Sequence, residues 1–199
     1  MLQTVVPQFT ERFPAVELEI ATDGRLVDIV KDGFDAGVRL REAVPQDMIA
    51  VPFGGPVRFV AVTSPDYLAR HGVPRAPGDL ARHRCIRQRL PSGRSYRWEF
   101  ARHGEEILVD VPGTLTLDHN RLMAESAARG LGIAFMPESV ASSALMSGDL
   151  VCVLEDWCPP FPGLCLYYPG RRHVPAALRA FADMLRAVDT KGRTASTFD

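Results

Sequence analysis

Apolar residues recur along the first 40 residues at spacings that change from helical to strand-like. Over residues 2–13 they repeat at helical spacing and predict an amphipathic helix. Residues 16–20 (VELEI) alternate strictly between apolar and acidic side chains, as in a strand with one buried face. Residues 25–32 are expected to form a second helix, and residues 36–40 (AGVRL) another short strand. This order predicts a βαβ unit with a right-handed crossover over a parallel sheet.

Helix and strand patterns continue to alternate through the rest of the chain. Ser64 can cap a helix, Pro65 suits its first position, and Gly72 ends it. Apolar runs predict further strands near residues 48–53, 57–63, 84–89, 96–101, 106–111, 131–136, 150–154 and 164–168. Caps, prolines and glycines predict further helices at residues 121–129, from Pro137 to Gly148 and from Pro175 to about residue 188. The fold class is therefore α/β, with parallel or mixed sheets.

The spacing of the elements predicts two α/β lobes. Residues 73–116 are denser in Pro, Arg and Gly, as expected for a second lobe that the chain enters and leaves. The predicted crossings are Thr63-Ser64 and residues 160–163. We therefore expect lobe I to comprise residues 1–62 plus 163–188, lobe II residues 63–162, and a disordered tail residues 189–199. A cleft should lie between the lobes, since ligands bind at strand ends in open α/β sheets.

Composition and charge restrict the class of partner. The chain has 199 residues, 46% hydrophobic and 24% charged, as in an ordinary globular protein. Because 23 Lys and Arg balance 24 Asp and Glu, no overall basic field is available to hold a phosphate backbone, and nucleic acid is not expected to bind this segment by itself. The first residues lack the pattern of a signal peptide, and no apolar run is long enough to span a membrane, so a cytoplasmic location is expected.

Motifs for catalysis, cofactors and metals are missing from the sequence. Gly130 and Gly132 do not continue into a dinucleotide-binding pattern, and no P-loop, H-E-x-x-H or G-x-S-x-G occurs. The histidines are not spaced like metal ligands, and the four cysteines include no C-x-x-C pair, so they are expected to be reduced structural thiols. We predict a protein that is not an enzyme and that needs no cofactor or metal.

Several linked segments occur in an order that resembles a known family. They read FTERFP, AVELEI, GFDAGVRL, VAVTSPDYLARHGVPRAPGDLARHRCI, YRWEF, GLGIAFMPES and LEDWCPPFPGLCLYYPGRRHVPAALRAFADML. Together they cover nearly all of residues 2–188 and resemble the effector-binding domain of LysR-type transcriptional regulators. The resemblance implies a type 2 periplasmic-binding-protein-like fold, with two α/β lobes joined by crossover strands and a small effector bound in the cleft between them.

The same resemblance implies a cytoplasmic homodimer or higher oligomer that contacts DNA through an N-terminal winged helix-turn-helix. No residues of this chain match that DNA-binding domain, or the first strand of lobe I that precedes the helix at residues 2–13 in the family. The chain is therefore expected to bind DNA only through a domain that it lacks, and lobe I is expected to be weakened. We expect an effector-sensing and dimerisation domain that binds a small, anionic or polar organic molecule. The alternatives are a solute-binding protein of the same fold and a truncated subunit that pairs with an intact regulator.

Candidate effector-binding residues in lobe I lie where predicted strands end. Thr22 and Asp23 follow the strand at residues 16–20, where they can hold a polar effector or cap the following helix. Arg39 ends a buried strand and can bind an anionic ligand through two hydrogen bonds, or pair with an acid such as Asp35 or Glu42.

Lobe II supplies the remaining candidates. Asp118, His119 and Asn120 precede a helix whose backbone N–H groups can bind an anion, although Asp118 would repel one, and simple capping is the alternative. Met136 and Pro137 end a buried strand and can form an apolar wall of the cleft or part of the core. The weaker candidates are Arg89 and Ser92, with Thr63 and Ser64 at the crossing.

Overall fold

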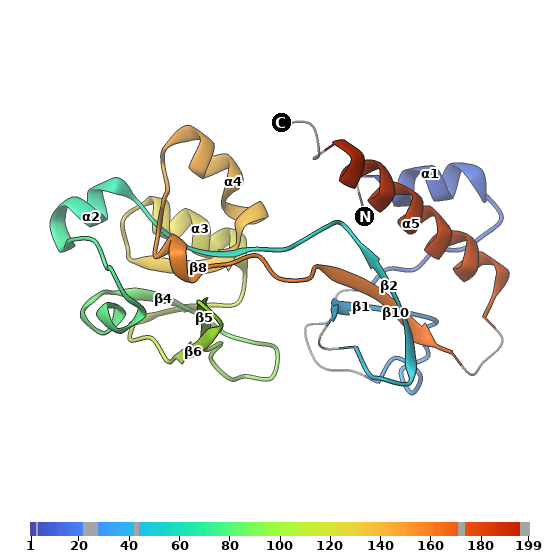
Figure 1. Cartoon of the computed structure of the whole chain (residues 1–199), viewed down its shortest axis with the longest axis horizontal. Helices are drawn as coiled ribbons and strands as arrows, with labels where there is room; N and C mark the ends of the chain where they lie inside the picture. The colour runs from blue at the N-terminus through green and yellow to red at the C-terminus, as the bar shows by residue number, and fades with distance from the viewer. Residues whose placement is uncertain (3, 22–27, 42–43, 171–173, 196–199) are drawn as a thin grey trace. The chain divides into compact units, whose positions relative to one another are not determined.

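The chain folds into two compact units, which are described separately (Figure 1). The computed structural model describes residues 1–2, 4–21, 28–41, 44–170 and 174–195. For residues 188–195 it describes the backbone alone. Unit 1 comprises Met1–Val57 and Phe161–Asp199, and unit 2 comprises Arg58–Pro160. The chain therefore passes between the units twice.

Unit 1 is built on a three-stranded antiparallel sheet. Its order is β1 (Gly37–Leu40), β10 (Leu164–Pro169) and β2 (Met48–Phe53), with β10 in the centre. Helices α1 (Val5–Arg12) and α5 (Ala176–Ala195) pack side by side, and Phe9 of α1 meets Phe181 of α5 edge-on at 5.0 Å. Every second residue of β10 faces this helical layer, so Leu166 and Tyr168 join its core.

The predicted parallel βαβ unit is not found among the described residues of unit 1. Residues 16–20 are not a strand, although Val16 and Leu18 still pack against the core. Alternation records which side chains are buried, but a strand also needs a neighbour to accept its backbone hydrogen bonds, and no described strand pairs with this segment. In place of the predicted helix at 25–32, the described residues 29–32 form turns, and residues 22–27 lie outside the described part of the chain.

Unit 2 contains a five-stranded mixed sheet in the order β7-β4-β8-β3-β9. Its strands are β3 (Phe59–Thr63), β4 (Cys85–Gln88), β7 (Leu115–Leu117), β8 (Ile133–Pro137) and β9 (Val151–Val153). Strand β4 runs parallel to both β7 and β8, whereas β3 runs antiparallel to β8 and β9. The prediction of a mixed sheet is confirmed here, but the short strand β7 was missed.

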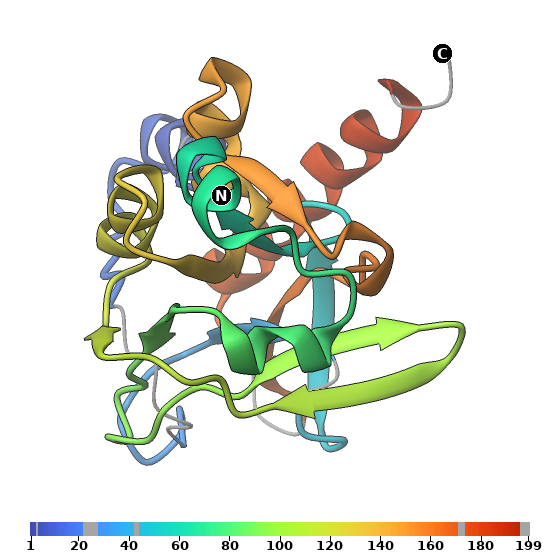
Figure 2. The same cartoon turned by 90° about the vertical axis from the view of Figure 1, so that its left-hand side faces the viewer.

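The two faces of this sheet carry different layers (Figure 2). Val60, Val62 and Met136 face a layer formed by α3 (Asn120–Ala128) and α4 (Glu138–Ser147). Ala61 and Phe135 face the opposite layer. That layer consists of α2 (Pro65–His71), the 3-10 helices η2 (Pro77–Arg82) and η3 (Glu155–Trp157), and the hairpin of β5 (Trp98–Arg102) and β6 (Glu105–Val109).

Local sequence signals explain several element ends. The Ser64 hydroxyl accepts a hydrogen bond from the Tyr67 backbone N–H at 3.2 Å, and Pro65 occupies the first position of α2, as predicted. Gly148 ends α4 with a φ of 79°, the left-handed conformation that glycine adopts without strain.

Two predicted boundaries differ from the structure. Strand β3 was assigned to lobe I, but its hydrogen-bonded neighbours β8 and β9 place it in unit 2, so the chain crosses at Val57–Arg58 rather than at Thr63-Ser64. Helix α5 continues to Ala195, into the tail that was expected to be disordered. No helix among the described residues is both long enough and apolar enough to cross a membrane.

Candidate functional site

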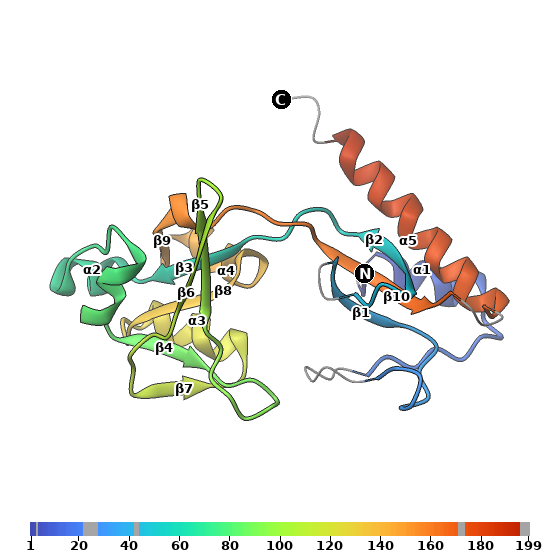
Figure 3. The same cartoon turned by 60° about the horizontal axis from the view of Figure 1, so that its bottom comes forward.

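Three strands of unit 2 end side by side at one edge of the sheet, and Figure 3 shows two of them, β4 and β7, running in the same direction. Because β7, β4 and β8 are parallel neighbours, the residues that follow them converge. Arg89 follows β4, Asp118 follows β7, and Pro137 ends β8. The Arg89 backbone N–H donates a 2.7 Å hydrogen bond to the Leu117 carbonyl, which joins two of these ends directly. We call this the strand-end site, and it brings together most of the lobe II candidates.

The first turn of α3 borders the strand-end site. His119 is the N-cap residue of α3, and its side chain makes no capping hydrogen bond. Asp118 and His119 are exposed, whereas the Asn120 side-chain oxygen is buried and has no partner among the described residues. A buried acceptor without a donor costs about 1–3 kcal/mol, so a donor supplied by a ligand or by water would stabilise it.

Arg89 and Ser92 lie on the turn that leaves β4. The Arg89 guanidinium donates a 2.9 Å hydrogen bond to the Gly93 carbonyl, which folds its side chain over this turn. Ser92 is exposed at the same turn. Both residues are therefore close to the carboxyl end of β4.

Met136 and Pro137 have different environments. Met136 has no exposed surface and packs in the core with Val60 beneath α3 and α4, so core packing accounts for it. Pro137 is half-buried opposite Phe59 in the β3–β8 pairing and precedes α4. Of these two residues, only Pro137 is partly accessible at the strand-end site.

Two aromatic residues at this edge were missed from the sequence. Phe59 pairs with Pro137, and the Tyr96 backbone N–H donates to the Gln88 carbonyl at 2.8 Å. Their half-buried rings lie 6.4 Å apart and pack against the buried Phe135 ring. Burial raises the pKa of the Tyr96 hydroxyl above its ordinary value, and the Glu99 carboxylate raises it further. Only the aromatic-rich segment YRWEF could have indicated Tyr96 in advance.

Thr63 and Ser64 lie at the opposite edge of the sheet, because β3 runs antiparallel to β8. The Thr63 hydroxyl donates a 2.9 Å hydrogen bond to the carbonyl of Gly132, the residue that precedes β8. Ser64 caps α2, and both side chains are buried. The structure therefore separates these two candidates from the strand-end site and gives them structural hydrogen bonds.

The unit 1 candidates are only partly described. Thr22 and Asp23 lie outside the described residues. Arg39 is half-buried on β1, with its guanidinium carbon 5.0 Å from the centroid of the Tyr167 ring. Gly37 leaves room for that ring, because a Cβ at Gly37 would come within 2.6 Å of it. Arg39 is therefore held over an aromatic ring in the manner of a cation–π contact.

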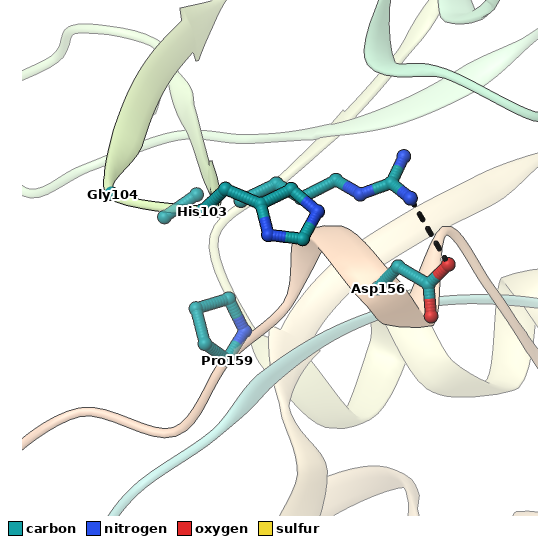
Figure 4. Close-up of a pocket in the computed structure, with 6 residues that line it drawn as sticks. His103, Gly104, Asp156 and Pro159 are labelled. Carbon is teal, nitrogen blue, oxygen red and sulfur yellow. Dashed lines mark ion pairs between the residues drawn. The ribbon is translucent and has the colours of Figure 1, made fainter.

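A separate hollow of about 560 Å³ lies at the turn of the β5–β6 hairpin (Figure 4). It is lined by Ala101, Arg102, His103, Gly104, Asp156 and Pro159, none of which was a candidate. Within the described residues, no group of three or more His, Cys, Asp or Glu side chains could hold a metal ion.

Comparison with known proteins identifies the family. A sequence model described as the LysR substrate binding domain matches residues 1–190. The chain is 41% identical over 185 residues to an uncharacterised HTH-type transcriptional regulator, YcaN, of Escherichia coli, covering 93% of this chain and 60% of that protein. It is 42% identical over 195 residues to a putative transcriptional regulator of Pseudomonas aeruginosa, covering 98% of this chain and 63% of the relative. The chain thus spans about 60% of the length of these relatives, which are named as regulators rather than enzymes.

Solved structures agree with this result. Full-length AphB of Vibrio cholerae, a virulence activator of the LysR type, is 25% identical with a TM-score of 0.77, covering 95% of this chain and 64% of that one. The regulatory domain of AphB from Vibrio vulnificus is 24% identical with a TM-score of 0.76, covering 94% of this chain and 91% of that one. These neighbours confirm the type 2 periplasmic-binding-protein-like fold that the sequence predicted. The chain belongs to the LysR substrate-binding domain family.

Proposed function

We propose that this chain is the effector-sensing domain of a LysR-type transcriptional regulator and that it binds a small organic molecule at the strand-end site. The observation that carries the proposal is the convergence of Arg89, the Asp118–Asn120 segment and Pro137 at one edge of the unit 2 sheet. The carboxyl ends of neighbouring parallel strands are where open α/β sheets bind ligands. Membership of the family supports a sensing role.

The chemistry of the strand-end site favours an effector that is both polar and able to donate a hydrogen bond. The Asn120 side-chain oxygen is a buried acceptor without a partner among the described residues, so a ligand donor would satisfy it. The N–H groups of the first turn of α3 offer donors to an acceptor on the same ligand. The half-buried rings of Phe59 and Tyr96 supply apolar surface beside these polar groups. Arg39 of unit 1 stays a predicted contact for an anionic group.

Regulation of transcription requires partners beyond this segment. LysR-type regulators act as oligomers and bind DNA through an N-terminal domain. We propose that this domain contributes effector sensing and self-association to such an assembly, within the cytoplasm. An effector that binds one arrangement of the assembly more tightly than another would shift the population towards the arrangement that it prefers.

A thermal-shift screen of the 199-residue chain against small organic acids and amino acids tests the proposal. A ligand that binds only the folded chain raises the unfolding temperature in proportion to its saturation. Any compound found is then titrated by calorimetry against the parent chain and against Arg89→Ala and Asn120→Ala. Each substitution should weaken binding by about tenfold, the effect of one hydrogen bond to a charged or buried group.

Leu131→Ser is the matched control, because Leu131 is 51% exposed and precedes β8 at the opposite edge of the sheet. It should leave the affinity unchanged. The proposal fails if no compound raises the unfolding temperature, or if the compounds found bind Arg89→Ala and Asn120→Ala as tightly as the parent.

A further inference from the structure

The hollow at the hairpin turn presents one positive and one negative side chain to the same space (Figure 4). Arg102 ends β5, and Asp156 lies in the middle of η3, so two separate elements supply the charges. Their nearest nitrogen and oxygen are 3.8 Å apart. This separation exceeds hydrogen-bonding distance, so the pair attracts without forming a hydrogen bond.

Both charged groups therefore keep hydrogen-bonding capacity. Within the described part of the chain, neither Arg102 nor Asp156 makes a side-chain hydrogen bond. The Arg102 guanidinium carbon lies 5.2 Å from the centroid of the Trp157 ring, which orients the guanidinium without using its N–H groups. The two side chains are 40% and 79% exposed, so a ligand can reach both.

The elements that carry these charges are fixed in place. Strand β5 is anchored by Trp98 and Phe100, which are buried in the core beneath the hairpin. Helix η3 is held by an ion pair of Glu155 with Arg58 at 3.3 Å. The spacing between the two charges is therefore set by the fold, and the binding groups are already in position before a ligand arrives.

From these contacts we infer that the hollow binds a zwitterionic α-amino acid, with the ligand carboxylate on Arg102 and the ligand ammonium group on Asp156. A simple anion would be attracted by Arg102 but repelled by Asp156. A simple cation would be attracted by Asp156 but repelled by Arg102. A ligand that carries both charges on one carbon, as an α-amino acid does, gives each of these two side chains a further opposite partner. The selection therefore depends on the two charges together.

The remaining lining suits the rest of such a ligand. Ala101 and Pro159 offer apolar surface for an amino-acid side chain, and the His103 imidazole adds a hydrogen-bonding group at the turn. A volume of about 560 Å³ accommodates a single amino acid. The residues that line the hollow include none of those at the strand-end site, so the two sites are distinct.

The test is an NMR titration of the isotopically labelled 199-residue chain with L-alanine, propionate and ethylammonium in separate series. L-alanine should shift the backbone amide signals of His103 and Gly104 and the indole signal of Trp157. Propionate and ethylammonium should each bind about tenfold more weakly, since each lacks one charge-assisted hydrogen bond. Arg102→Gln and Asp156→Asn should each weaken L-alanine binding by a similar factor.

Arg121→Gln is the matched control, because Arg121 forms an exposed ion pair with Glu125 at 3.1 Å on α3. It should leave the L-alanine titration unchanged. Equal binding of propionate and L-alanine would overturn the inference, as would the absence of shifts with all three probes. Shifts confined to His119 and Asn120 would also overturn it, while supporting ligand binding at the strand-end site.

Discussion

The Tyr67 hydroxyl oxygen lies 3.3 Å from Nδ1 of His83 and accepts a 2.8 Å hydrogen bond from the Arg84 backbone N–H. Donor and acceptor roles between these two groups depend on the tautomer of His83, and Nδ1 accepts the Tyr67 hydroxyl proton when Nδ1 itself carries none. Nδ1 can accept that proton only while His83 is neutral. The Tyr67 ring, which is fully buried, also lies 4.4 Å from the ring of His71.

Stability should therefore fall as the pH drops through the ordinary range of histidine. Burial lowers the pKa of His83, the nearby His71 lowers it further, and Asp79 opposes the shift. The unfolded chain has a histidine pKa of about 6.5, and the folded chain has a lower one. Above a pH of about 6.5 the contribution of this difference to stability is fully present. As the pH falls from there towards the folded pKa, the unfolded chain binds the proton more readily, and the contribution is lost. Urea unfolding at a series of pH values between neutral and mildly acidic measures the loss.

His83→Gln removes the titrating group, so the variant should show a smaller decrease in unfolding free energy over that pH range. His71→Gln should reduce the decrease in part, because it removes the neighbouring positive charge. The same pH dependence in His83→Gln and the parent chain would contradict the assignment to His83.

The β5–β6 turn should become more stable when His103 is replaced. Arg102 pairs with Glu105, and the two residues between them have positive φ angles of 52° for His103 and 82° for Gly104. A two-residue turn of this type prefers asparagine or glycine at the first position. His103→Asn should raise the unfolding free energy by about 0.5 kcal/mol, because the strain of a left-handed residue falls. Thermal unfolding measures the gain, and His103→Ala, which keeps the strain, should show none.

Most elements of the fold could be predicted because their signals are local. The Ser64-Pro65 cap, the apolar stripe of α5 and the buried run of β8 each reflect a short stretch of sequence, and all three elements formed as expected. The prediction of a strand at residues 16–20 was wrong because strand pairing depends on a neighbour elsewhere in the chain. The three-residue strand β7 was missed since so short a run carries no periodicity.

The candidate site could be predicted only in part, because strand direction is not readable from local sequence. The Asp118–Asn120 segment was predicted from the helix that follows it, and parallel pairing of β7 with β4 places it beside Arg89, which was a weaker candidate. Thr63 was predicted as a crossing residue, but the antiparallel direction of β3 puts it at the other edge. Arg102 and Asp156 could not be found in this way, because 54 residues separate them and no motif joins them.

The cysteine thiols should be unreactive in the folded chain. Burial raises the pKa of Cys85 to about 12 and that of Cys158 to about 11, so almost no thiolate forms at neutral pH. Burial also raises the pKa of Cys152, which is only half-buried, and Glu155 raises it further. Titration with a thiol-reactive dye at neutral pH should label all four cysteines only after unfolding. Rapid labelling of Cys85 in the folded chain would contradict this prediction.

Gly163 should tolerate no side chain, because it faces the backbone where the chain returns to unit 1. A Cβ at Gly163 would lie 1.8 Å from the Gly55 carbonyl oxygen, well inside van der Waals contact. The obstructing atom belongs to the backbone, and Val57 and Phe161 exchange two 3.0 Å hydrogen bonds beside it, so the segment cannot move aside without losing pairing. Gly163→Ala should therefore lower the unfolding free energy by about 2 kcal/mol, measured by urea denaturation. Gly78→Ala is the matched control, since a Cβ there meets no atom within 4 Å, and it should be neutral or slightly stabilising. Equal stabilities of the two variants would show that the backbone at Gly55 adapts to a Cβ at residue 163.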